Sequence, residues 1–351
     1  MTRRLNLGQR EAGGERRVYI IAELSANHGQ DYDQAVELIR AAGAAGADAI
    51  KLQTYTPDTI TIDCRTEYFR VVKGMIWEGK NLYDLYGEAY TPWEWQPRLK
   101  ELAGSLGMDC FSTPFDASAV DFLESMNVPA YKIASFELVD LPLIEKVART
   151  GKPTIMSTGM ATLAEIDEAV RAFRKAGGME LALLKCNSGY PALPEEMNLA
   201  TIPHLSDAFD VPVGLSDHTL GNAATIAAVA LGATIIERHF TMSRDVPGPD
   251  SAFSLEPHEF RDMVHAVRDV ERALGRVQYE PSPREMSSRI FRRSLFVVQD
   301  VAAGELLSSE NVRSIRPGHG LAPKYLPIVL GRRAVRNLQR GEPLAWNMIS
   351  E

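Results

Sequence analysis

Cysteine is scarce in this chain of 351 residues, and long apolar runs are missing. Cys64, Cys110 and Cys186 are odd in number, widely spaced and form no Cys-x-x-Cys pair. This pattern argues against a disulfide framework and a thiolate zinc site, and it indicates a reducing, cytoplasmic environment. No stretch approaches the roughly 20 apolar residues of a membrane helix, and the polar N-terminal segment lacks the apolar centre of a secretory signal. We therefore expect a cytoplasmic protein with no membrane partner.

A broad basic character is also missing, because the formal net charge is −8. From Arg284 to the C-terminus, 11 Lys+Arg face 6 Asp+Glu, which leaves 27 Lys+Arg against 40 Asp+Glu in the rest. A nucleic-acid-binding protein needs a wide basic face, so we expect no nucleic-acid partner. The basic C-terminal segment is compatible with an element that closes over an anionic substrate, and equally with an ordinary surface imbalance.

What the sequence does contain is an alternation of short apolar runs with Ala/Leu-rich amphipathic segments. Strands that alternate with helices predict parallel βαβ units, and eight such units match the roughly 250 residues of a (β/α)8 TIM barrel. An open doubly wound sheet is the alternative, but no Gly-x-Gly-x-x-Gly follows the first run. The predicted strands are 18–24, 47–53, 108–115, 130–135, 152–159, 181–187, 211–217 and 233–240.

Two segments interrupt this alternation. Residues 54–91 are far longer than the usual βα loop of about 2–6 residues, which indicates a functional insertion, and they are rich in aromatic side chains. A Pro/Ser-rich stretch predicts a linker before a small, mostly-β domain. The expected organisation is a loose polar tail at 1–17, a catalytic barrel at 18–275, a linker at 276–289 and the small domain at 290–351.

Polar side chains occur at almost every predicted strand end. In a TIM barrel these ends converge on one mouth, where active sites lie, and burying so many polar groups without partners would cost several kcal/mol each. For any single residue a structural hydrogen bond at the rim is the alternative. The groups are Glu23, Lys51, Gln53, Ser112, Thr113, Lys132, Ser135, Ser157, Thr158, Lys185, Asn187, Ser216, Asp217, His218, Glu237, Arg238 and His239.

The chemistry of this set indicates an anionic substrate and a metal. Lysines and hydroxyls that face one mouth suit a phosphate or carboxylate. His218 and His239, on successive strands, can bring two imidazoles together, which suits Mn, Zn, Fe or Co. Glu23 and Asp250 offer carboxylates for proton transfer. We expect Arg238 to be a structural partner of Glu237 rather than a catalyst.

Several motifs, in one order, resemble the nonulosonic acid synthases, the sialic-acid-synthase-like family that condenses phosphoenolpyruvate with an N-acylated sugar. The resemblance extends from about residue 18 to 351, and the segment with "RPGHG" resembles the antifreeze-like (SAF) domain of these enzymes. The motifs are "IIAELSANHGQDYDQA", "GADAIKLQTYTPDT", "FSTPFD", "PAYKIASFEL", "MSTGMA", "GLSDHT", "ERHFT" and "PGPDSAFSL".

The resemblance implies a role for each matched residue. Glu23 would be the catalytic carboxylate, and His218 and His239 would ligate a divalent metal, usually Mn²⁺, with Mg²⁺ or Co²⁺ as alternatives. Arg316 would reach the barrel mouth of a second copy, which implies a domain-swapped homodimer. The sugar would contact Gln53, Tyr190 and Asp250. Phosphoenolpyruvate would contact Lys51, Thr113, Lys132, Ser135, Ser157, Ser216 and either Asn187 or Ser188.

Within the family, "AELSANH", "KLQTYTPDT" and "KGMIWEGKNLYDLYGEAYTPWEW" are more similar to the pseudaminic acid synthases than to the N-acetylneuraminate synthases. This branch would use 2,4-diacetamido-2,4,6-trideoxy-L-altrose and release phosphate by C–O cleavage. An N-acetylneuraminate or legionaminic acid synthase with another sugar is the alternative. Trp77, Tyr83 and Tyr86 are candidates for an apolar wall against the deoxy sugar, or for packing in a dimer. A metal-dependent aldolase or hydrolase and a sugar-binding protein are more distant alternatives.

Overall fold

A computed structural model describes residues 4–14, 17–72 and 76–350. The remaining residues of the predicted tail, of the aromatic insertion and of the C-terminal domain lie outside the described part. The chain divides into two compact units, Met1–Gly275 and Arg276–Glu351, each with its own hydrophobic core.

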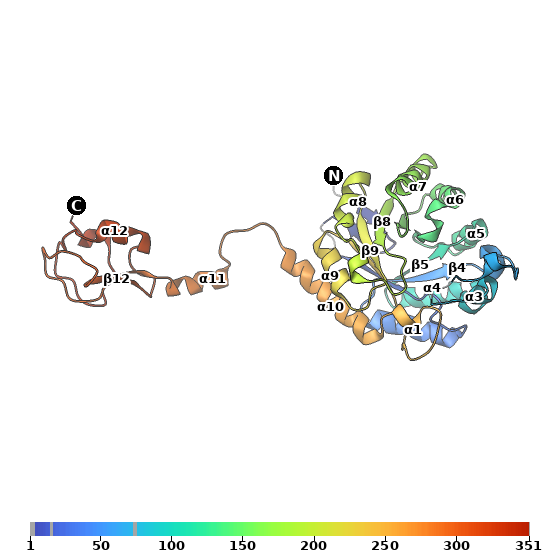
Figure 1. Cartoon of the computed structure of the whole chain (residues 1–351), viewed down its shortest axis with the longest axis horizontal. Coiled ribbons are helices and arrows are strands. Elements are labelled where there is room, and N and C mark those ends of the chain that lie inside the picture. The colour runs from blue at the N-terminus through green and yellow to red at the C-terminus, as the bar shows by residue number, and fades with distance from the viewer. Residues whose placement is uncertain (1–3, 15–16, 73–75, 351) are drawn as a thin grey trace. The chain divides into compact units, whose positions relative to one another are not determined.

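Eight parallel strands close into a barrel in the first unit (Figure 1). Strands adjacent in the chain pair with one another, and the last pairs with the first to complete the ring. The predicted (β/α)8 barrel is confirmed, and the closed ring excludes the open doubly wound sheet. The strands are β3 (Tyr19–Glu23), β4 (Ala49–Thr54), β5 (Asp109–Pro114), β6 (Tyr131–Ile133), β7 (Thr154–Ser157), β8 (Leu181–Cys186), β9 (Val213–Asp217) and β10 (Ile235–His239).

Helices surround the barrel, and α7 illustrates why they form where they do (Figure 1). Thr162 and Glu165 make a capping box at its start, which satisfies backbone donors of the first turn. Its buried residues recur every three or four positions between Ile166 and Phe173, so one stripe faces the barrel. The helices are α1 (Tyr32–Ala44), α4 (Gln96–Ser105), α5 (Ala117–Ser125), α6 (Leu141–Arg149), α7 (Leu163–Lys175), α8 (Thr201–Phe209), α9 (Ala223–Ala230) and α10 (Pro257–Leu274).

Close packing at the barrel wall requires a glycine on β9. A Cβ atom at Gly214 would lie 2.2 Å from the carbonyl oxygen of Ile235 and 2.6 Å from Cδ2 of Leu184. The first contact is with backbone of the adjacent strand, which cannot move aside cheaply. Gly214 therefore allows β9 to keep its register beside β10.

The aromatic insertion between β4 and α4 is folded rather than an open loop. It contains α2 (Pro57–Ile60) and α3 (Leu82–Ala89). Asn81 caps α3 by accepting from the backbone of Tyr83, and its amide donates to the carbonyl of Cys64 at 2.7 Å. This one side chain ties the two halves of the insertion together.

The N-terminal segment also differs from the expected loose tail. β1 (Arg4–Asn6) pairs antiparallel with β2 (Glu11–Gly13), and Leu5 and Leu7 are completely buried. The overall polarity of the segment hides two leucines at strand spacing, which are enough to anchor a short hairpin.

Polar contacts attach this hairpin to the N-terminal end of the barrel. The backbone N–H of Gln9 donates to Oδ1 of Asp109 at 3.0 Å, and Arg10 makes an ion pair of 2.7 Å with Asp48. Asp48 and Asp109 lie at the starts of β4 and β5. The hairpin therefore covers the end of the barrel opposite the strand C-termini, and the C-terminal mouth stays available for a site.

The second unit contains α11 (Pro283–Ser288), β11 (Ser294–Val297), β12 (Val312–Ile315) and α12 (Leu326–Val329). β11 and β12 pair antiparallel, and isolated bridges extend the pairing to other segments. Its core includes Leu295, Val297 and Val312. Helix α11 lies within the stretch predicted as a linker.

No helix in the described ranges is both long and apolar enough to cross a membrane. The three cysteines are free thiols.

Candidate active site at the barrel mouth

The barrel brings most of the predicted site residues to the C-terminal ends of its strands. Others follow directly in the loops: Ser135, Asn187, Ser188, Tyr190, His218 and Asp250. On the strands themselves are Glu23 (β3), Lys51 and Gln53 (β4), Thr113 (β5), Lys132 (β6), Ser157 (β7), Ser216 (β9) and His239 (β10).

Lys51 is buried among carboxylates and a hydroxyl. Its Nζ forms an ion pair with Glu23, lies 3.6 Å from Oε2 of Glu237, and donates to Oγ1 of Thr113 at 3.3 Å. Burial lowers the pKa of Lys51, but the charges of Glu23 and Glu237 outweigh it and the pKa lies above its usual value. Lys51 therefore stays cationic at neutral pH.

Lys132 lies on the other side of Glu237. Its Nζ donates to Oγ of Ser157 at 2.7 Å and lies 3.9 Å from Oε1 of Glu237, which also accepts from Ser216 at 2.9 Å. Burial raises the pKa of Glu237, but Lys132 and then Lys51 outweigh this, so its pKa is below the usual value. An ionised carboxylate thus sits between two lysines.

The placement of Glu237 and Arg238 corrects the sequence interpretation. Arg238 does not pair with Glu237, because side chains alternate along β10 and the two point to opposite faces. Arg238 is completely buried and forms an ion pair with Asp217 of β9, and it also donates to the carbonyl of Thr219 at 2.6 Å. Asp217 and Arg238 are thus structural, while Glu237 joins the site.

Two carboxyls at the mouth have a pKa near neutrality. Burial raises the pKa of Glu23 to about 7, against the opposing charge of Lys51. Burial likewise raises the pKa of Glu137 to about 7. Glu137 lies in the short 3-10 helix after β6 and was not predicted, because nothing in "SFEL" distinguishes it from a surface residue. Such groups can hold or release a proton at neutral pH.

Two predicted site hydroxyls lie beside Gly159. Its backbone N–H donates to Oγ of Ser135 at 3.0 Å. A Cβ atom at this position would lie 2.7 Å from Oγ of Ser135 and 2.3 Å from Oγ of Ser188. The absence of a side chain therefore leaves room for two hydroxyls side by side.

Asn187, the alternative to Ser188, is engaged within its own loop. Its Oδ1 accepts from the backbone N–H of Gly189 at 2.7 Å, and its Nδ2 donates to the carbonyl of Glu196 at 3.2 Å. This arrangement favours Ser188 as the residue that faces a ligand.

The two predicted metal-binding histidines are adjacent. The ring centroids of His218 and His239 are 5.2 Å apart. Nδ1 of His218 lies 2.8 Å from the carbonyl oxygen of Asn187, so this nitrogen carries a proton. Burial lowers the pKa of His218, but Cys186 and the Asn187 carbonyl outweigh it, so the pKa is above its usual value. Nδ1 of His239 is buried without a hydrogen-bond partner. Burial, and then the nearby His218, lower the pKa of His239 and keep it neutral.

This pair fits a divalent cation that takes its other ligands from elsewhere. No group of three or more His, Cys, Asp or Glu side chains among the described residues is arranged to hold a metal ion. Two imidazoles are suitable donors once a cation replaces the proton on Nε2 of His218. The chain would therefore supply two nitrogens and leave the remaining positions to water or substrate.

Aromatic rings line the histidine side of the mouth. Tyr190 lies 4.7 Å from the His218 ring and 4.9 Å from Phe253, and Phe253 lies 4.9 Å from His239 (centroid distances). Trp77 comes from the aromatic insertion, packs 5.7 Å from Tyr190, and donates its indole N–H to the carbonyl of Pro249 at 2.7 Å.

The other two aromatic candidates for the wall lie elsewhere in the insertion. Tyr86 packs on Tyr55 with centroids 5.7 Å apart. Tyr83 donates to Asp58 at the surface. Of the three candidates, Trp77 is the one packed against Tyr190.

Gln53 and Asp250, predicted to contact a sugar, meet at Ser25. The hydroxyl of Ser25 donates to the carboxylate of Asp250 and accepts from Nε2 of Gln53 at 3.3 Å. Burial raises the pKa of Asp250 to about 6. Arg316 belongs to the second unit, where its side chain is exposed, and its reach to another copy stays a prediction.

Comparison with known proteins shows the family that this chain resembles. The NeuB family model matches residues 38–279 and the SAF domain model matches residues 292–350. The chain is 45% identical to pseudaminic acid synthase of Helicobacter pylori, over 93% of this chain and 96% of that protein. It is 38% identical to N,N'-diacetyllegionaminic acid synthase of Legionella pneumophila, over 99% and 98%. The crystal structure of N-acetylneuraminic acid synthetase from Leptospira borgpetersenii superposes with a TM-score of 0.72 at 33% identity, over 82% of this chain and 95% of that one.

Proposed function

The chain belongs to the NeuB family, and we propose that it is a pseudaminic acid synthase. It would join phosphoenolpyruvate to 2,4-diacetamido-2,4,6-trideoxy-L-altrose and water, giving pseudaminic acid and phosphate. The observation that carries the proposal is the pair of buried lysines on either side of Glu237, at the mouth of a chain more similar to a pseudaminic acid synthase than to a legionaminic one.

The lysines and the hydroxyls would hold phosphoenolpyruvate. Lys51 and Lys132 supply positive charge in a buried site, where charge-assisted hydrogen bonds are strongest. A preformed set of donors needs no rearrangement when the anion arrives, so it can stabilise charge that develops during the reaction. The hydroxyls in this set are Thr113, Ser135, Ser157, Ser188 and Ser216.

The reaction forms one carbon–carbon bond and breaks one carbon–oxygen bond. C3 of phosphoenolpyruvate attacks the aldehyde carbon of the open-chain sugar, and C2 acquires oxocarbenium character. Water adds to C2, and the C2–O bond breaks so that phosphate leaves with the bridging oxygen. Glu23, whose pKa is about 7, would accept a proton from that water.

His218 and His239 would hold a divalent cation, which the family resemblance suggests is Mn²⁺, with Mg²⁺ or Co²⁺ as alternatives; two imidazole nitrogens completed by oxygen ligands can accommodate such an ion. When bound, the cation would polarise the aldehyde oxygen of the sugar. His239→Ala should lose Mn²⁺ binding, measured by titration calorimetry or by the electron paramagnetic resonance signal of Mn²⁺. Its melting temperature should stay within a few degrees of the wild-type value. Unchanged Mn²⁺ affinity would contradict this assignment.

Trp77 would select the deoxy sugar. It packs on Tyr190 beside the loop that carries Asp250, and it offers an apolar surface to a substrate whose C6 is a methyl group. A sugar with a hydroxyl there would lose a hydrogen bond to water without replacement. N-acetylneuraminate synthesis is the alternative that this contact disfavours, because N-acetylmannosamine carries a 6-hydroxyl. Legionaminic acid synthesis also starts from a 6-deoxy sugar, and the lower identity to a legionaminic acid synthase disfavours it instead.

The second unit is the part of the chain that we expect to mediate dimer formation. We propose that residues 276–289 act as a linker and that residues 290–351 are the SAF domain of a homodimer, in which Arg316 reaches the partner's barrel mouth. The basic balance of this segment would suit an anionic substrate. A cytoplasmic location accords with the three free thiols.

The experiment that tests the proposed reaction is an isotope label. Phosphoenolpyruvate labelled with ¹⁸O in the bridging position is incubated with the protein, Mn²⁺ and the diacetamido sugar. C–O cleavage leaves the label in the released phosphate, detected by mass spectrometry together with a nine-carbon product. Label retained in the organic product, or phosphate without the nine-carbon acid, would contradict the proposal.

A further inference from the structure

The turn after β3 contains an unusual backbone conformation at a buried position. Ser25 has φ of +47° and is 1% exposed. Residues with a Cβ rarely adopt this left-handed region, and they persist there only when surrounding contacts fix them. The contacts that fix Ser25 therefore indicate what the turn is for.

Within the part of the chain that the structure describes, Ser25 makes three polar contacts with predicted site residues. Its backbone N–H donates to Oε1 of Glu23 at 3.0 Å. Its hydroxyl donates to Asp250 and accepts from Gln53 at 3.3 Å. One residue thus joins the proposed proton acceptor on β3, a sugar contact on β4 and a sugar contact in the loop after β10.

The neighbouring residues of the turn reinforce the same connection. The backbone N–H of Ala26 also bonds the Asp250 carboxylate. The amide of Asn27 donates to the carbonyl of Phe240 at 2.9 Å and to Oγ of Ser254 at 2.8 Å, and that hydroxyl donates to the carbonyl of Asp250 at 2.6 Å. The loop after β10 is therefore held by the turn at both its side chain and its backbone.

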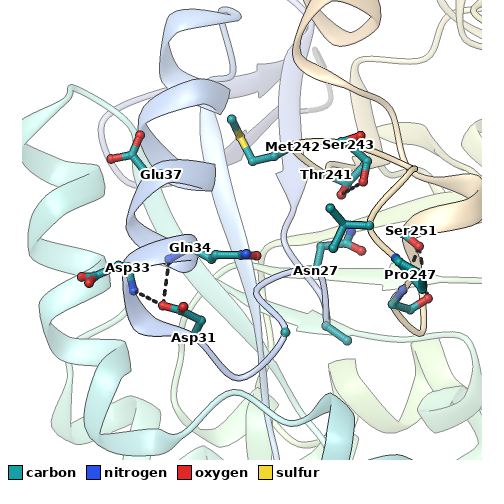
Figure 2. Close-up of a pocket in the computed structure, with 14 residues that line it drawn as sticks. Asn27, Asp31, Asp33, Gln34, Glu37, Thr241, Met242, Ser243, Pro247 and Ser251 are labelled. Carbon is teal, nitrogen blue, oxygen red and sulfur yellow. Dashed lines mark hydrogen bonds between the residues drawn. The ribbon is translucent and has the colours of Figure 1, made fainter.

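The surroundings explain why the loop needs such anchoring. A pocket of about 300 Å³ lies between the start of α1 and the segment after β10, with Asn27 and Ser251 in its wall (Figure 2). The loop borders this space on one side, and the indole of Trp77 holds it at the carbonyl of Pro249. The hydrogen bonds from the turn fix the carboxylate of Asp250 itself.

We infer that Ser25 is a positioning residue, which sets Asp250 and Gln53 against Glu23 so that the sugar is bound in the orientation that reacts. The inference rests on the proposed function. A merely structural role would change the stability of the loop. Positioning instead changes the KM for the sugar and leaves the KM for phosphoenolpyruvate unaltered, because the hydroxyl of Ser25 bonds Asp250 and Gln53, which are proposed sugar contacts, and not Lys51 or Lys132 among the described residues.

Two substitutions separate the hydroxyl from the backbone conformation. Ser25→Ala removes the hydroxyl and keeps the unfavourable φ, while Ser25→Gly removes the hydroxyl and relieves it. Both variants should raise the sugar KM roughly 10- to 100-fold and change the phosphoenolpyruvate KM less than about threefold, since a charge-assisted hydrogen bond and an oriented contact are lost. Ser25→Gly should melt at or above the temperature of Ser25→Ala.

Ser206→Ala is the matched control, since Ser206 is a half-buried serine of α8 whose hydroxyl donates to the carbonyl of Val211 at 3.1 Å, before the start of β9, and it should leave both KM values unchanged. The assay is phosphate release with each substrate varied at saturating concentrations of the other. A sugar KM within twofold of wild type in both Ser25 variants overturns the inference alone, as does an equal rise in both KM values. A wild-type protein that makes no product with any amino sugar overturns the proposed function and this inference with it.

Discussion

Gly159→Ala is the sharpest perturbation that the phosphoenolpyruvate site allows. The new methyl group would lie 2.3 Å from Oγ of Ser188 and 2.7 Å from Oγ of Ser135, so both hydroxyls must rotate away. Gly159 does not have a left-handed φ, so alanine causes no backbone strain. The substitution therefore disturbs the two hydroxyls proposed to contact phosphoenolpyruvate, without altering a charge.

The magnitude follows from those two contacts. A hydrogen bond to a charged group contributes ~1.5–3 kcal/mol. At the lower value, the loss of both costs about 3 kcal/mol, or roughly 150-fold in kcat/KM for phosphoenolpyruvate. The melting temperature should change by only a few degrees, since the substitution adds one methyl group and displaces two short side chains.

Steady-state phosphate release with phosphoenolpyruvate varied measures this effect. Gly104→Ala on α4 is the control, because a Cβ there meets nothing within 4 Å, and its kinetics should equal those of wild type. In a protein that already carries Ser135→Ala and Ser188→Ala, Gly159→Ala should add less than about a twofold loss, since no hydroxyl is left to displace. A full additional loss in that background, or none in the wild-type background, would refute the reasoning.

Three further predictions concern other parts of the site. Asp217→Asn leaves Arg238 buried without its counter-charge and should lower the free energy of unfolding of the barrel by ~3–5 kcal/mol in urea titrations; a loss below about 1 kcal/mol contradicts the pairing. Trp77→Ala should raise the KM for the sugar about tenfold and leave the KM for phosphoenolpyruvate unchanged, because aromatic packing contributes ~0.5–1.5 kcal/mol beyond area burial. Trp77→Phe should give an intermediate KM for the sugar. A sugar KM equal to that of wild type in Trp77→Ala would contradict the proposed contact between Trp77 and the sugar. Glu23 can act as a base only when it is ionised, so kcat should rise with pH through about 7. Glu23→Gln should lower kcat ~100- to 10,000-fold and abolish this rise. An unchanged pH profile in Glu23→Gln would contradict the proposed role of Glu23.

The barrel and much of the site could be predicted from the sequence because both depend on local regularities. Alternation of apolar runs and amphipathic helices defines the (β/α)8 fold, and the geometry of the fold then sends the strand ends to one mouth. Lys51, Lys132 and His239 are found by this reasoning alone. No detailed packing is needed to place them.

Other features depend on contacts that sequence patterns do not record. The chain order of Glu237 and Arg238 suggests an ion pair between them. Neighbouring side chains of a strand point to opposite faces, however, so Arg238 pairs with Asp217 on the adjacent strand. Ser25 carries no sequence signal, since its importance lies in a backbone angle and in contacts with residues 28 and 225 positions away. The N-terminal hairpin depends on Leu5 and Leu7, which a polar composition conceals.

The central claim is that this site condenses phosphoenolpyruvate with a diacetamido trideoxy sugar. The most direct measurement is phosphate release from phosphoenolpyruvate and Mn²⁺ with two sugars in parallel, 2,4-diacetamido-2,4,6-trideoxy-L-altrose and N-acetylmannosamine. We predict release with the altrose derivative alone. Release with N-acetylmannosamine and none with the altrose derivative would contradict the account and move the protein to the sialic acid branch of its family.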